Sequence, residues 1–177
     1  GWTKPATGNA SWVSNAAEAT HLVKSLRSGA IGHNQKAQIQ FTANIAGSSF
    51  LFDVKTSTEG GLDLFRVYVD GVGKINPMSG IANWQTISVA VTPGIHTIKF
   101  EYAKNGSGVA GSDAVWIDKV VYADGTDTDG DGQRDALDSD DDNDGLPDVM
   151  DPLPLQAKFN RNANYKGSQV RDSNGVQ

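Results

Sequence analysis

Hydrophobic and polar residues alternate along much of the chain with the two-residue period of a β-strand. The clearest case is Ala37–Ile45, where every odd-numbered residue is apolar and every even-numbered residue is polar. From residue 84 to 91 the odd-numbered residues 87, 89 and 91 are again apolar, and Trp84 falls on the polar face with Thr86 and Ser88. Each stretch predicts a strand with one face in a core and the other towards solvent.

Shorter runs with similar apolar and β-branched residues cover much of the first 122 residues. Further strands are predicted at residues 11–13, 22–26, 50–55, 62–69, 95–102 and 114–122. Turn-forming residues separate them, at Gly47-Ser48, Asp70-Gly71 and Pro93-Gly94 among other places. No convincing amphipathic helix is present, and residues 16–19 are either a helical turn or a loop. The predicted fold class is all-β, a sandwich of the jelly-roll kind.

A different pattern occupies Asp127–Asp151, with the sequence DTDGDGQRDALDSDDDNDGLPDVMD. The pattern D-x-D-x-D-G-x-x-D-x-x-D occurs in it twice, with an offset of 13 residues at every matched position. The matched carboxylates are Asp127, Asp129, Asp131, Asp135 and Asp138, then Asp140, Asp142, Asp144, Asp148 and Asp151. This regularity favours two binding loops over the alternative, a disordered acidic linker.

The spacing within each copy suits a hard cation. Carboxylates at loop positions 1, 3 and 5 can converge, glycine at position 6 permits a sharp turn, and a main-chain carbonyl serves at position 7. That carbonyl belongs to Gln133 in the first loop and to Leu146 in the second. Oxygen ligands without histidine or cysteine favour Ca²⁺ over zinc or copper, so we expect two or more calcium ions.

Only one residue separates the two copies, so neither an EF-hand nor a dockerin-type pair with its helical spacers fits. The stretch resembles the thrombospondin type 3 repeat in the cysteine-free form of bacterial secreted proteins. That resemblance implies a chain wound around a row of calcium ions with little regular secondary structure. Together with the strand pattern and the polar residues after Pro152, this predicts three regions: a β-sandwich at residues 1–123, calcium repeats at 124–152 and a polar tail or linker at 153–177.

The charge of the chain follows this division. The chain has 21 acidic and 15 basic residues, a net charge of −6. Eleven of the acidic residues and Arg134 lie in Asp127–Asp151, which gives that stretch −10 and the remainder +4. The remainder shows no basic stripe, so no nucleic-acid partner is expected. The chain also lacks cysteine and any apolar run of membrane-spanning length.

The predicted sandwich carries a resemblance of its own. Residues 56–71, Trp84, residues 92–102 and residues 112–118 are similar to a jelly-roll module of bacterial secreted proteins, related to MAM-type and carbohydrate-binding β-sandwiches. Such modules stack sugar rings on exposed aromatic side chains. The candidates here are Trp84 with its neighbour Asn83, and also Trp116 and Tyr68. The alternative is that these rings fill the core or its edge.

The resemblance also implies a second calcium site, because such modules often pair an N-terminal glutamate with an aspartate of the last strand. In this chain those residues are Glu18 and Asp118, with Asp63 and Asp113 as further candidates. The alternative is that these aspartates bond turn amides.

No H-E-x-x-H, G-x-S-x-G or P-loop motif is present, and the three histidines are scattered, so we expect no enzyme. We expect a secreted, extracellular module that binds polysaccharide or a cell-surface glycan beside neighbouring domains of a larger bacterial protein. A start at Gly1-Trp2 without a signal peptide is typical of an excised fragment. The alternatives are a protein-interaction or adhesion module and a structural spacer.

Overall fold

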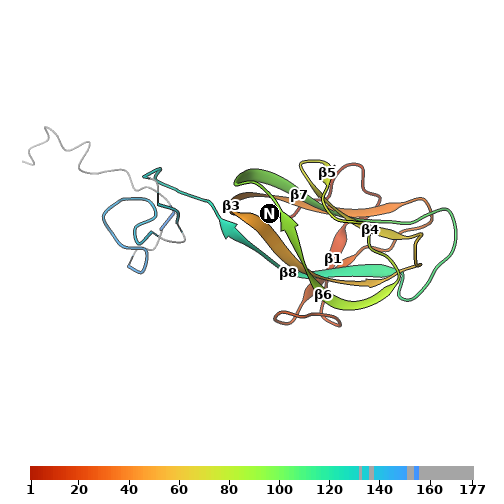
Figure 1. The fold of residues 1–177 in the computed structure, drawn as a ribbon. Coiled ribbons are helices and arrows are strands. Elements are labelled where there is room, and N and C mark those ends of the chain that lie inside the picture. The colour runs from red at the N-terminus through yellow and green to blue at the C-terminus, as the bar shows by residue number, and fades with distance from the viewer. Residues whose placement is uncertain (132, 136–137, 151–153, 156–177) are drawn as a thin grey trace, which may run out of the picture. The chain divides into compact units, whose positions relative to one another are not determined.

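The computed structural model describes residues 1–131, 133–135, 138–150 and 154–155. The chain divides into two compact units, Gly1–Gly125 and Thr126–Gln177. Every named strand lies in the first unit (Figure 1). Throughout the described ranges, no helix has the length and apolar character needed to cross a membrane.

Eight strands build the first unit. They are β1 (Trp12–Asn15), β2 (Ser25–Ser28), β3 (Lys36–Ser57), β4 (Leu64–Val69), β5 (Val72–Gly73), β6 (Ile81–Ala90), β7 (Gly94–Ala103) and β8 (Ala114–Asp124). All pairings between these strands are antiparallel.

The 22-residue strand β3 takes part in both layers of the sandwich (Figure 1). Its first part, residues 36–45, pairs with β7, and β4 and β5 follow beyond β7. Its second part, residues 49–57, lies between β6 and β8, and β2 and β1 continue that layer beyond β8. One strand therefore joins the two sheets without a connecting loop.

The core lies between these layers and follows the predicted alternation. The odd-numbered apolar residues of Ala37–Ile45 are all buried. In the second part of β3, Phe52 is fully buried and its ring lies 5.0 Å from that of Phe100 on β7 and 6.2 Å from that of Phe65 on β4. Aromatic contacts of this kind add to the stabilisation from buried apolar area. The all-β sandwich predicted from sequence is confirmed.

Two details of the strand prediction were wrong. Gly47-Ser48 does not end a strand, because β3 continues through it and its register against β8 shifts between Ile45 and Phe50. Glycine permits such an irregularity inside a strand, so the break is local and the strand persists.

The strand predicted at residues 22–26 begins later, as β2 at Ser25. Leu22 has a positive φ of 56° and is 85% exposed, and Val23 is also exposed. Their apolar side chains suggest a strand in the sequence, but of the three apolar residues at 22, 23 and 26 only Leu26 pairs in the sheet, with Ser14 of β1 and Ile117 of β8. Strand β5 was not predicted, because two residues are too few to show alternation.

Candidate functional site

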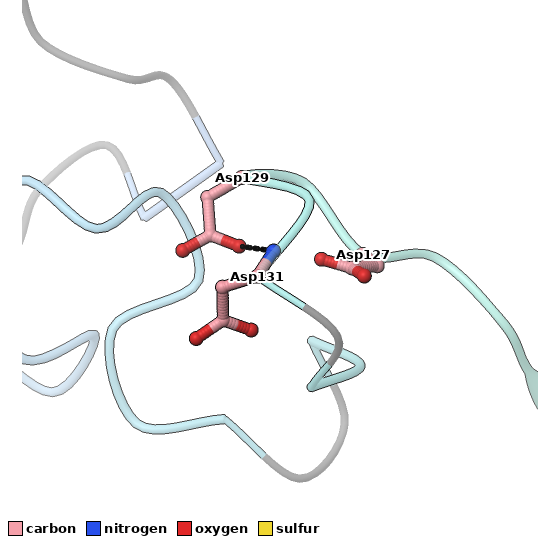
Figure 2. Close-up of side chains that lie close together, drawn as sticks. All are labelled: Asp127, Asp129 and Asp131. Carbon is pink, nitrogen blue, oxygen red and sulfur yellow. Dashed lines mark hydrogen bonds between the residues drawn. The ribbon is translucent and has the colours of Figure 1, made fainter.

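The first candidate site consists of two groups of three aspartates in the second unit. One group is Asp127, Asp129 and Asp131, and the other is Asp140, Asp142 and Asp144. In each group three carboxylate oxygens, one from each residue, lie within 4.8 Å of one another. Figure 2 shows the carboxylates of the first group close together. It also shows the carboxylate of Asp129 accepting a hydrogen bond from the backbone nitrogen of Asp131. The structure therefore brings loop positions 1, 3 and 5 together, as the spacing predicted.

The backbone of the two loops follows the same 13-residue offset. In the first loop the amide of Asp135 donates to the carbonyl of Thr126 at 3.0 Å, and in the second the amide of Asp148 donates to that of Ser139 at 2.9 Å. Gly130 and Asn143, which are 13 residues apart, both have positive φ. The sequence repeat is thus a repeat of local structure.

The position-5 aspartates hold the turn that follows them. Oδ1 of Asp131 accepts from the amide of Gln133 at 2.7 Å, and Oδ1 of Asp144 accepts from that of Leu146 at 2.9 Å. Each of these carboxylates accepts a hydrogen bond from the backbone amide two residues later, as aspartate often does in turns.

The aspartates at position 9, whose role as ligands stays a prediction, accept hydrogen bonds within their own loops. Asp135 accepts two hydrogen bonds from Thr128, one from its amide at 2.8 Å and one from its hydroxyl at 2.9 Å. Thirteen residues later, Asp148 accepts from the amide of Asp141 at 2.9 Å. These carboxylates stabilise the loops and are not in the two groups of three.

The position-12 residue of the first loop, Asp138, accepts from the amides of Ser139 and Asp140 at 2.7 and 3.1 Å. It therefore links the end of the first loop to the start of the second. Its counterpart, Asp151, lies outside the described residues. The predicted contributions of Gln133 and Leu146 are main-chain carbonyls, and they remain predictions.

Sequence reasoning did not single out Asp141, which matches no position of the pattern. Burial raises the pKa of its carboxyl group, and the neighbouring charges of Asp148, Asp135 and Asp138 raise it further. Oδ1 of Asp141 and Oδ2 of Asp129 are buried and accept no hydrogen bond from the described residues. A divalent cation would satisfy such oxygens and offset the repulsion among them, so the residues present fit calcium.

The predicted ligands Glu18 and Asp118 each contact other groups of the sandwich, and their role as a metal site stays a prediction. Glu18 instead forms an ion pair with Lys55, with 2.8 Å between Nζ and Oε1. Asp118 accepts from the amides of Thr20 and His21 at 2.7 and 2.9 Å. Burial acts to raise the pKa of Asp118, but these hydrogen bonds outweigh it and lower the pKa. Each carboxylate is thus satisfied by the protein itself.

The other two acids of that prediction, Asp63 and Asp113, do approach a common cation, which is the ammonium group of Lys104. Lys104 contacts Oδ2 of Asp113, and its Nζ lies 3.9 Å from Oδ2 of Asp63. A side chain of the protein therefore takes the place in which a metal ion was expected.

The three candidate aromatic rings differ in how open they are. Trp116 is 5% exposed, and its ring is covered by Arg27 and Lys55, whose cationic groups lie 5.5 and 5.6 Å from the ring centroid. Tyr68 is half-buried, with the Lys99 ammonium group 4.3 Å from its ring centroid. A cationic group therefore lies over each of these two rings, and Trp116 is buried as well.

Trp84 is half-buried on β6, between the exposed residues Asn83 and Gln85. Among the residues that the structure describes, no other ring or cation packs on it. Thr86 on β6 pairs with Asp53 of β3 and donates to its carboxylate, and the register of the two strands shifts beside Trp84, between Val54 and Thr56. Trp84 is therefore the candidate ring with the most open surroundings.

No family model matches the chain, and neither does any curated protein. Several solved structures are similar to it. The secreted serine protease VesC from Vibrio cholerae is 14% identical with a TM-score of 0.48, over 62% of this chain and 23% of that one. A family 35 carbohydrate binding module from Clostridium thermocellum is 16% identical with a TM-score of 0.38, over 66% of this chain and 97% of that one.

The catalytic domain of a GH87 α-1,3-glucanase in complex with nigerose is 14% identical with a TM-score of 0.41, over 70% of this chain and 26% of that one. This chain spans less than a third of the protease and glucanase chains that it matches.

Proposed function

We propose that this chain is an extracellular, non-catalytic accessory module whose second unit binds calcium. The observation that carries the proposal is the repeated group of three aspartates, each with converging carboxylate oxygens and the same turn at its fifth position. Charge supports it, because the stretch Asp127–Asp151 has a net charge of −10 and only one basic residue.

Binding would couple to the order of the segment. Each Ca²⁺ ion cancels two negative charges, so two ions reduce the mutual repulsion of eleven carboxylates. A site that is assembled only in the folded loop contributes its binding free energy to folding. With calcium the segment would be a stiff connector, and without it the carboxylates would push the loops apart.

Isothermal titration of calcium into chelator-treated protein tests this directly. We expect at least two equivalents, with Asp129→Asn and Asp142→Asn each removing one, since each takes a carboxylate from one group. Glu18→Gln is the matched control, because its carboxylate is paired with Lys55, and it should keep the full stoichiometry. Unchanged stoichiometry in both aspartate variants would reject the proposal.

A second proposed function is polysaccharide binding by the sandwich, and the open surroundings of Trp84 beside Asn83 favour it. An indole ring can stack on the apolar face of a sugar while a neighbouring amide bonds its hydroxyl groups. The module would then hold a tethered neighbouring domain close to its polymer and raise the effective concentration of the pair.

Affinity electrophoresis through gels that contain different polysaccharides tests this function. Retardation should be lost in Trp84→Ala and retained in Ile81→Ala, a change at an exposed residue of the same strand. Absence of retardation by every polymer would favour the alternatives, a protein-interaction or adhesion module or a structural spacer.

A further inference from the structure

A group of reactive side chains lies where three strands of the sandwich begin or end. Lys104 directly follows β7, Asp113 directly precedes β8 and Asp63 directly precedes β4. The Lys104 ammonium group contacts Oδ2 of Asp113. An amine and a carboxyl group are thus held against each other at the two ends of the loop of residues 105–112.

The two members of this pair differ in burial, because the side chain of Asp113 is 28% exposed whereas that of Lys104 is enclosed. The side chain of Lys104 is 2% exposed and Asp63 is 0% exposed. Asp63 is held in place because its Oδ1 accepts from the amide of Asn105 at 2.9 Å. Its other oxygen, Oδ2, accepts no hydrogen bond from the described residues and lies 3.9 Å from Nζ of Lys104. It is therefore placed to accept a proton from that nitrogen.

The remaining oxygen of Asp113 also has a donor. The hydroxyl of Tyr102 donates to Oδ1 of Asp113 at 2.7 Å. Burial raises the pKa of Tyr102, and the hydrogen bond to Asp113 raises it further, so the hydroxyl keeps its proton. A neutral donor at that position stabilises negative charge that develops on Oδ1.

We propose that Lys104 and Asp113 condense into an intramolecular isopeptide bond, with Asp63 as the proton-transfer group. A proton first passes from the ammonium group to the carboxylate of Asp113, which leaves a neutral amine beside a neutral acid. The Nζ lone pair attacks Cγ of Asp113, and Asp63 takes a proton from nitrogen and delivers it to the departing hydroxyl group. The C–N bond forms, the bond from Cγ to Oδ2 breaks, one water leaves and Asp63 returns to its starting state.

Two physical effects favour this reaction over persistence of the ion pair. Holding amine and carboxyl in contact replaces an encounter in solution with an effectively unimolecular step. The buried ammonium group of Lys104 also carries a desolvation cost, which a neutral amide removes. In a chain without cysteine, such a bond would close the loop between β7 and β8 covalently.

The mass of the denatured, intact protein tests the proposal. We expect it to be lower than the sequence mass by one water. Lys104→Arg keeps the positive charge but should show the full sequence mass, and Asp63→Asn should slow or abolish the loss of water. Asp53→Asn is the matched control, because it changes a buried carboxylate in the same sandwich and should keep the loss.

Peptide mapping locates the bond. A branched tryptic peptide should join residues 104 and 113, and cleavage after Lys104 should be absent. Succinimide formation at an Asp-Gly pair such as Asp70-Gly71 also loses water, but hydroxylamine cleaves a succinimide and leaves the isopeptide bond intact. A wild-type protein at full sequence mass, with Lys104 open to acetylation after denaturation, would overturn the proposal.

Discussion

At the scale of single residues, charged side chains buried in the sandwich find partners within the sandwich itself. Glu101 is buried and accepts from Gln38 at 2.6 Å and from Tyr68 at 3.3 Å. Lys104 is enclosed by two aspartates. Because an unpaired buried charge is costly, this pairing explains why acids expected to bind a metal in the sandwich are already occupied.

A more exposed pair, His96 and Asp70, gives a prediction about pH. Nδ1 of His96 lies 2.6 Å from Oδ2 of Asp70, and Nε2 lies 2.7 Å from the carbonyl oxygen of Thr92. Both partners are acceptors, so they favour the protonated imidazolium form of the ring over the neutral one. The hydrogen bond to Asp70 raises the pKa of His96 above its ordinary 6.5, with nearby Lys74 opposing the shift.

The pKa shift sets the direction of the effect. The contribution of His96 to stability is fully present below pH 6.5 and is lost as the pH rises through its raised folded-state pKa. The bond to His96 lowers the pKa of Asp70 from 3.8, so its contribution is present above that value and is lost in stronger acid.

Thermal unfolding at a series of pH values measures this. The midpoint of the wild type should fall as the pH rises through the folded-state pKa of His96, and His96→Gln should lack that fall. His33→Gln, which changes an exposed histidine, should behave like the wild type. The same pH dependence in His96→Gln would show that the His96 pair contributes nothing.

At the scale of elements, β3 makes the sandwich one cooperative structure, because a single strand supplies core residues to both layers. Its neighbours β6, β7 and β8 all pair with it directly. A defect in its buried face should therefore weaken both sheets.

Phe52→Ala on β3 should lower the free energy of unfolding by about 3–5 kcal/mol, the usual range for a buried phenylalanine. Phe52 is fully buried and contacts the rings of Phe65 and Phe100 from the other layer. The adjacent Leu51 is 40% exposed, so Leu51→Ala should cost about 1 kcal/mol or less. Chemical denaturation measures both values, and equal losses would contradict the assignment of faces.

At the scale of the whole molecule, the two units are stabilised by different interactions. The first unit has the hydrophobic core, and all of its largest buried side chains lie before residue 118. In the described part of the second unit, carboxylates accept hydrogen bonds from backbone amides, and the exposed large hydrophobic residues include Val149 and Met150. The first unit should therefore fold alone, whereas the second should depend on cations.

A truncated chain, Gly1–Gly125, tests this division. It keeps Gly125, whose amide donates a hydrogen bond to the carbonyl of Asn44 at 2.9 Å. The carbonyl of Gly125 accepts one from the side-chain amide of Asn44 at 2.7 Å. It should unfold cooperatively, with a midpoint that calcium does not change. The full chain should become more compact by small-angle scattering when calcium is added. A calcium-dependent midpoint in the truncated chain would point to a metal site within the sandwich.

Local rules were enough to predict the strands with long alternation and the two convergent groups of aspartates. Alternation places residues on opposite faces of one strand, and the 1-3-5 spacing brings neighbouring carboxylates together within one loop. Both depend on residues close in the chain. The sequence therefore determined the all-β class and the arrangement of Asp127, Asp129 and Asp131.

Tertiary structure decided which partner each side chain takes. Glu18 meets Lys55, and Trp116 lies beneath Arg27 and Lys55, through packing between segments far apart in sequence. The same long-range packing places Lys104 between Asp63 and Asp113. Spacing along the chain cannot supply these contacts, because they depend on how β3 joins the two layers and on where the loops between strands come to rest.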